Sequence, residues 1–99
     1  MSVMTIRADV KPERVAEIEA AAQKMFAAIG EAQPDGVRYA SCRIPGSDTF
    51  VVVLQVDDGI ENPLASVPAF RDFQEGLREA MAGPPVAEPL AVVGSYRLF

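Results

Sequence analysis

Residues 50–56 read FVVVLQV, an almost entirely apolar run that polar turn residues bound on both sides. Its length and its β-branched side chains predict a β-strand. Alternate side chains of a strand point to opposite faces of a sheet, and in this run both faces are apolar. A sheet with one face in water should alternate apolar and polar side chains, so the run predicts a strand covered on both faces.

Three more strands are expected around this run. The segment Val37–Ile44 precedes it across the turn Pro45–Asp48, so the two segments predict an antiparallel hairpin with the strand Thr49–Val56. The outer strands are expected at Val3–Val10 and at Pro89–Leu98.

Two amphipathic helices separate the outer strands from the hairpin. The first is expected to begin near Pro12, because a missing N–H costs nothing at a helix start, and to be ended by Gly30 and then by the turn Pro34-Asp35-Gly36. Ser66 is the expected cap of the second helix, which should stop before Pro84. The expected buried stripes are Val15, Ile18, Ala22, Met25 and Ile29 in the first helix and Phe70, Phe73, Leu77 and Met81 in the second.

The order β-α-β-β-α-β predicts a ferredoxin-like α+β fold, in which both helices cover one face of a four-stranded antiparallel sheet. Residues 1–99 are expected to form this single domain. Because the helices leave the second apolar face uncovered, the pattern predicts a homodimer in which two sheets stack about a two-fold axis. The alternative is that Val51 and Val53 are β-branched residues favoured at a half-exposed strand position.

Composition limits the partners that the chain can have. The formal net charge is −5 with no basic block, so a nucleic-acid partner is not expected. No run of about 18 apolar residues is present and the N-terminus resembles no secretory signal, so no membrane association is expected. Cys42 is the only cysteine, which suits a cytoplasmic protein.

Absent residue types exclude several kinds of site. The chain has no histidine, no tryptophan and one cysteine, which excludes Ser-His-Asp triads, Cys-His pairs, histidine metal sites and thiolate clusters within one chain. Neither a P-loop nor a dinucleotide-binding glycine motif occurs. Asp57, Asp58 and Glu61 form an acidic loop whose spacing matches no EF-hand, and it is interpreted as a solvated turn with no metal.

Several strand residues are candidates for a functional role. Arg7 is expected to be enclosed on a central strand, where its guanidinium needs Asp9, a second subunit or a substrate enolate or phenolate as its anionic partner. Tyr39 and Tyr96 either offer a hydroxyl to a pocket or fill the core. Cys42 is expected to be a small buried hydrophobic residue. Three arginines are expected on edge strands, where charge discourages aggregation: Arg38, Arg43 and Arg97.

A pocket is expected between the helices and the sheet, although the aromatic side chains that would line it also suit a packed core. The loop from Asp57 to Ser66 is the expected lid, because it is long and rich in Gly and Pro. Within it, Asn62 and Pro63 are expected to start one short helical turn.

The segment PAFRDFQEGL, residues 68–77, resembles the second helix of the antibiotic-biosynthesis monooxygenase family of the dimeric α+β barrel superfamily. The ending from Gly83 to Tyr96 is similar to that family's last strand. The resemblance covers nearly the whole chain and implies a homodimer with a ligand cleft between sheet and helices. Members include oxygenases that oxidise quinols, anthrones and related polyphenols without metal or flavin, so no cofactor is expected.

The resemblance implies a cofactor-independent monooxygenase acting on a small aromatic, quinol-type compound, with Arg7 or Tyr39 stabilising the oxyanion. The expected substrate-binding residues are Asn62, Phe70, Phe73 and Tyr96. Haem degradation, which other members perform, is not expected because the histidine and tryptophan it uses are absent. The alternative is a non-catalytic homodimer that binds a small hydrophobic ligand or has only a structural role.

Overall fold

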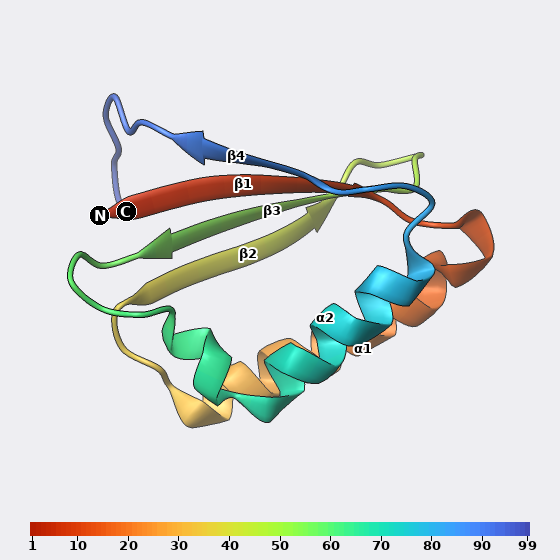
Figure 1. Ribbon diagram of the computed structural model, residues 1–99, viewed down its shortest axis with the longest axis horizontal. Helices are drawn as coiled ribbons and strands as arrows, with labels where there is room; N and C mark the ends of the chain where they lie inside the picture. Colours follow the sequence, from red (N-terminus) through yellow and green to blue (C-terminus); the bar gives the residue numbers. More distant parts are fainter.

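A four-stranded sheet and two helices form two layers, with both helices on one face of the sheet (Figure 1). The computed structural model describes residues 1–99. Its elements are β1 (Ser2–Asp9), the 3₁₀ turn η1 (Pro12–Arg14), α1 (Val15–Ala32), β2 (Val37–Arg43), β3 (Thr49–Val56), the 3₁₀ turn η2 (Pro63–Ser66), α2 (Pro68–Ala80) and β4 (Val86–Leu90). This order and the antiparallel pairing of all strands confirm the predicted ferredoxin-like α+β fold.

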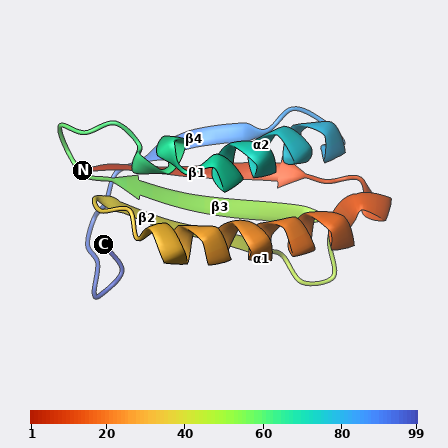
Figure 2. The same cartoon turned by 90° about the horizontal axis from the view of Figure 1, so that it is seen from below.

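The strands lie side by side in the order β2-β3-β1-β4, so β3 and β1 are central and β2 and β4 are edges. Figure 2 shows α1 on the β2 side of the sheet and α2 on the β4 side. Each helix therefore crosses back over the sheet between two strands, as the two predicted crossovers require. Neither helix combines the length and the apolar composition needed to cross a membrane.

The face of the sheet that meets the helices is set by the strand register. Ile6 of β1 lies opposite Val52 of β3, which lies opposite Ser41 of β2, so the three side chains share this face. The helix face of the hairpin carries Phe50, Val52, Leu54 and Val56 from β3 and Val37, Tyr39, Ser41 and Arg43 from β2. Together with the apolar sides of the helices it encloses the core.

The other side of the sheet, here called the open face, has no helix over it. It carries Val3, Thr5, Arg7, Asp9, Arg38, Ala40, Cys42, Thr49, Val51, Val53, Gln55, Val86, Glu88 and Leu90. Val51 and Val53 are half-buried there, flanked by neighbouring strands. The strand β3 is thus apolar on both faces, as its sequence predicts. The helices cover one face, and the C-terminal tail, residues 91–99, covers only part of the other, where Leu98 and Phe99 line a pocket with Val53.

The core lies between the helices and the sheet. Met25 of α1, Leu64 of η2 and Val10 after β1 are its most completely buried large side chains. Phe70 and Phe73 lie on the buried side of α2, as the spacing of apolar residues predicts.

The first helix continues past Gly30 and ends just before Pro34. Gly30 lies inside α1, which runs to Ala32, and Gln33 adopts a left-handed conformation with φ 46°. The next residue is Pro34, which disfavours helical geometry in the residue before it, so proline rather than glycine stops the helix. Of the two predicted stop signals, Gly30 was therefore wrong, and the turn that begins at Pro34 is confirmed.

The loop before the second helix is a structured turn. Asn62 caps η2 as expected, because its Oδ1 accepts a hydrogen bond from the N–H of Leu64 at 3.0 Å. Ser66 belongs to η2, and α2 begins at Pro68 with Val67 as its N-cap residue. The predicted cap at Ser66 was therefore wrong, since its hydroxyl bonds backward to the Pro63 carbonyl.

The last strand is shorter and earlier than predicted. β4 pairs only over Val86–Leu90, and Leu90 already lies opposite Val3 near the beginning of β1. The chain beyond Leu90 has run past the end of its partner strand, so residues 91–99 cannot extend the ladder. This C-terminal tail folds back towards β2, where the Arg38 guanidinium donates to the Leu98 carbonyl at 3.3 Å.

Replacing Leu64 by Ala is expected to lower the free energy of unfolding by about 2–5 kcal/mol, because the change leaves a cavity beneath a fully enclosed side chain. Chemical denaturation at a fixed protein concentration measures the loss. Ile60→Ala is the matched control in the same loop, since the Ile60 side chain is 48 % exposed. Equal losses of stability in the two variants would contradict the conclusion that the buried Leu64 side chain holds this loop against the core.

Candidate functional site

The helix face of β2 presents three polar side chains at alternate positions: Tyr39, Ser41 and Arg43. α1 lies on this side of the sheet and turns one of its own faces toward them. A strand places same-face residues about 6.6 Å apart, and a helix places same-face residues about 5–6 Å apart, so the two rows stay roughly in step over two or three positions.

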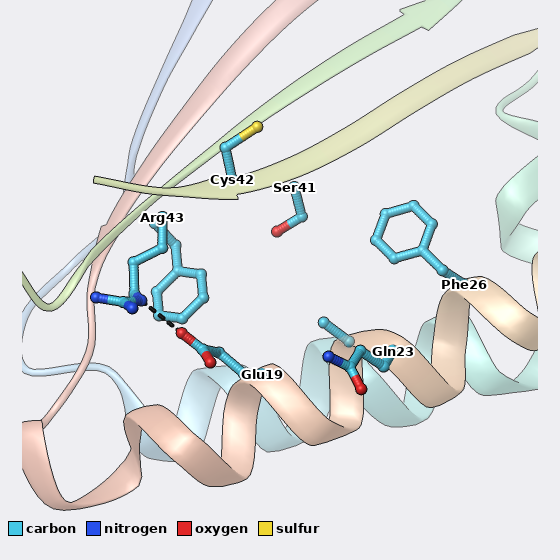
Figure 3. A pocket seen from close by; sticks show the side chains of 8 residues that line it. Glu19, Gln23, Phe26, Ser41, Cys42 and Arg43 are labelled. Atoms are coloured by element: carbon cyan, nitrogen blue, oxygen red, sulfur yellow. Dashed lines mark hydrogen bonds and ion pairs between the residues drawn. The ribbon is translucent and has the colours of Figure 1, made fainter. Parts of the chain in front are cut away.

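A groove with a volume of about 430 Å³ lies between these two rows of side chains, one on α1 and one on β2 (Figure 3). The groove is lined by Glu19, Ala22, Gln23 and Phe26 of α1, Ser41, Cys42 and Arg43 of β2 and Phe50 of β3. Ala22 and Ser41 are small, whereas larger side chains stand on either side of them. The groove is the space that two small facing residues leave between larger neighbours.

An ion pair closes one end of the groove. Arg43 Nε donates to Glu19 Oε1, and Arg43 Nη1 donates to the Ser47 carbonyl at 3.0 Å. Figure 3 shows the two charged side chains facing each other, while the Cys42 thiol points to the other side of the strand. Two hydrogen bonds to different elements hold the Arg43 guanidinium in one position.

An aromatic cluster lies at the other end. The rings of Phe26 and Tyr39 stack with centroids 5.1 Å apart, and Phe70 meets Tyr39 edge-on at 5.8 Å. Burial raises the pKa of the Tyr39 hydroxyl to about 12. Tyr39 is therefore neutral near pH 7 and can donate a hydrogen bond to an anion. Phe26 joins this cluster to the groove because it belongs to both.

Arg7 and Tyr39, the two predicted oxyanion donors, lie on opposite faces of the sheet. Arg7 is on the open face and its side chain is exposed within the chain, so the expected enclosure was wrong for a single subunit. Both helices pack on the other face, and the C-terminal tail, whose Leu98 and Phe99 line a pocket with Val53, covers part of the open face but leaves Arg7 exposed. Arg7 does not pair with Asp9, whose carboxylate accepts a hydrogen bond from the Thr49 hydroxyl at 2.6 Å.

The four predicted substrate-binding residues are not brought together. Asn62 is engaged as the cap of η2, and Phe70 and Phe73 are buried in the core, where only Phe70 reaches the Tyr39 ring. Tyr96 lies in the C-terminal tail beyond β4, 81 % exposed, with Arg97 over its ring. The loop expected to act as a lid is held down by Leu64.

Two further expectations need correction. Cys42 is exposed on the open face and is not a buried hydrophobic residue, since β2 is an edge strand. Arg97 lies in the tail and not on a strand. Nowhere in the chain do three His, Cys, Asp or Glu side chains converge as a metal site would require.

Sequence reasoning missed Glu19 and Arg43 as a site. The signal was present in β2, where Tyr39, Ser41 and Arg43 alternate with Arg38, Ala40 and Cys42. A polar side chain on the face that should meet a helix needs a partner on that helix. The rotation of α1 then determines that this partner is Glu19, and sequence periodicity does not fix that rotation.

Comparison with known proteins gives matches in structure only. No protein-family profile and no curated protein matches the sequence. A candidate antibiotic biosynthesis monooxygenase from Caulobacter crescentus CB15 superposes with a TM-score of 0.72 at 22% sequence identity, over 94% of this chain and 90% of that one. A second candidate of the same description, from Nitrosomonas europaea, gives a TM-score of 0.74 at 14% identity, over 95% and 100% of the two chains. Rv0793 from Mycobacterium tuberculosis gives 0.74 at 16% identity, over 95% and 96%. The chain shares the fold of structures described as antibiotic biosynthesis monooxygenases, as the sequence resemblance predicts.

The raised pKa of Tyr39 should make stability depend on pH in the alkaline range. The pKa of an unfolded tyrosine is about 10, so the neutral hydroxyl is favoured in the fold. This contribution to stability is fully present below about pH 10 and is lost as the pH rises through about 12. We expect the free energy of unfolding to fall over this interval in the wild type and to fall less in Tyr39→Phe.

Denaturation at a series of pH values measures the effect, and the ultraviolet absorbance of tyrosinate follows the ionisation directly. Tyr96→Phe is the control, because its ring lies outside the core. A high-pH step that survives in Tyr39→Phe would show that Tyr39 is not the buried tyrosine.

Proposed function

We propose that this chain is a cofactor-independent monooxygenase-like protein that acts on a small aromatic, quinol-type compound. The observation that carries the proposal is the groove between α1 and β2, whose lining residue Phe26 stacks on the neutral, half-buried Tyr39. The fold shared with structures described as antibiotic biosynthesis monooxygenases supports it.

Such a reaction requires little of the protein. A deprotonated quinol or polyphenol supplies the electrons that reduce oxygen, so neither a metal nor a flavin is needed. The protein provides an apolar pocket and a hydrogen-bond donor for the substrate oxyanion. Tyr39 is the proposed donor, since it keeps its proton at neutral pH and stacks against Phe26 at the groove.

Oxygen uptake by the purified, metal-free protein tests this function against a panel of quinols, anthrones and flavonols. We expect uptake above the protein-free rate, and a loss of about 10²–10³-fold in Tyr39→Phe if the hydroxyl is the oxyanion donor. Tyr96→Phe should keep the wild-type rate because Tyr96 is exposed in the tail.

Arg7→Ala separates the two faces of the sheet as locations for the chemistry. A rate that falls in Arg7→Ala and not in Tyr39→Phe would move the site to the open face. No uptake with any compound of the panel would count against an oxygenase.

A second candidate function is non-catalytic binding of a small ligand. It is favoured by the Glu19–Arg43 ion pair, because the two charged groups of the groove neutralise each other and leave no unpaired charge to drive a reaction. A ligand that co-purifies with the protein, identified by mass spectrometry, together with no oxygen uptake, would favour this candidate.

We also propose that the chain works as a homodimer formed through the open face. The face combines the apolar side chains of Val51 and Val53 with charges of both signs, among them Arg7 and Glu88. None of the ion pairs within the chain uses Arg7, Arg38 or Glu88. A second copy turned about a two-fold axis can set these positive groups against negative ones and cover the valines.

Val53→Glu is expected to convert a dimer into a monomer, because it places a carboxylate at the centre of the apolar part of the open face. Analytical ultracentrifugation at micromolar concentration measures the change. Ala27→Glu is the matched control, since Ala27 lies on the exposed side of α1. A wild-type protein that sediments as a monomer would refute the homodimer.

A further inference from the structure

The Glu19–Arg43 ion pair leaves atoms unused. Arg43 donates hydrogen bonds from Nε to Glu19 Oε1 and from Nη1 to the Ser47 carbonyl, while its Nη2 makes no hydrogen bond within the chain. Glu19 Oε2 has no partner either. One donor of the positive group and one acceptor of the negative group are therefore free at the end of the groove, where Figure 3 shows the two side chains facing each other.

Two more polar groups of the groove are uncommitted. The Ser41 hydroxyl and the Gln23 amide make no hydrogen bond within the chain, and Figure 3 shows the hydroxyl directed towards α1. Phe26 and Phe50 supply the apolar part of the lining. The groove volume of about 430 Å³ falls in the range of small-molecule sites.

We propose that the Glu19–Arg43 pair is a specificity-determining site for aromatic rings that carry two oxygens on adjacent carbons, as in a catechol. One ring hydroxyl donates to Glu19 Oε2, and the neighbouring oxygen accepts from Arg43 Nη2. The proposal narrows the proposed function from quinol-type compounds in general to those with adjacent oxygens, and it rests on that function for the location of the substrate. Adjacent oxygens fit because they present one donor and one acceptor side by side, to the free acceptor and the free donor of a single ion pair.

The charges of the pair select against other ligands. A carboxylate or phosphate that approached Arg43 would also meet the negative charge of Glu19, and an ammonium would meet the positive charge of Arg43. A neutral ring with one donor and one acceptor meets neither repulsion. Oxygens placed further apart on the ring, as in resorcinol or hydroquinone, cannot reach both members of the pair.

The Glu19–Arg43 ion pair is not needed for the stability of the fold. The side chains of Arg43 and Glu19 are 36 % and 42 % exposed, and exposed ion pairs contribute little to stability. Arg14 and Glu17 form another ion pair at the start of the same helix, away from the groove. The Arg14–Glu17 pair is therefore an internal control for the effect that loss of an exposed ion pair has on stability and binding.

Calorimetric titration of the full chain with catechol, resorcinol and hydroquinone under argon tests the proposal. We expect catechol to bind at least about tenfold more tightly than its two isomers. Glu19→Gln and Arg43→Gln should each lower the catechol affinity about tenfold and remove the preference. Glu17→Gln should change neither.

A fold control accompanies each variant. The thermal midpoint of Glu19→Gln should match that of Glu17→Gln, and the alkaline titration of Tyr39 should be unchanged. Equal binding of the three isomers, or a Glu19→Gln variant that binds catechol as well as the wild type, would overturn the proposal.

Working without oxygen keeps this inference separate from the enzymatic proposal. Selective catechol binding without oxygen uptake in air would support the site and refute the oxygenase. Oxygen uptake by a protein that binds the three isomers equally would support the oxygenase and refute the proposed site.

Discussion

Both helices of this chain pack on the same face of its sheet, and most other features follow from that constraint. Two right-handed crossovers in a four-stranded antiparallel sheet cannot place their helices on opposite faces. Residues that alternate along one strand therefore enter two different environments. On β3, Phe50 and Val52 enter the core, whereas Val51 and Val53 lie on the open face between neighbouring strands. The apolar surface left there is what a second subunit would cover.

The same constraint shapes the groove. α1 lies over the β2 side of the sheet, and β2 is an edge strand, so side chains between them are enclosed by the helix and the sheet but remain open at the sheet margin. Phe26 stacks on Tyr39 at one position, and Glu19 meets Arg43 at another. The small residues Ala22 and Ser41 lie between these two contacts. A site of this kind depends on one gap in the packing and on no strained backbone.

The element order, the central position of β3 and the aromatic side of α2 were predictable, because each rests on periodicity or turn residues within a short segment. Features that depend on distant segments were not. The end of β4 depends on where its partner strand β1 begins. The exposure of Arg7 depends on which face of the sheet the helices cover. The pairing of Glu19 with Arg43 needs the rotation of a helix against a strand, and strand alternation alone showed only that Arg43 shares a face with Tyr39.

The ionisation of Tyr39 limits the chemistry proposed for the groove. With a pKa of about 12, its hydroxyl donates a hydrogen bond at neutral pH but cannot take a proton from a substrate. The deprotonation of a quinol must then be made by another group or by solvent, and Glu19 supplies the one carboxylate in the lining of the groove. The proposed site for adjacent ring oxygens sets one ring hydroxyl against this carboxylate. The group that would select the substrate is then also the one carboxylate that the lining offers to take its proton.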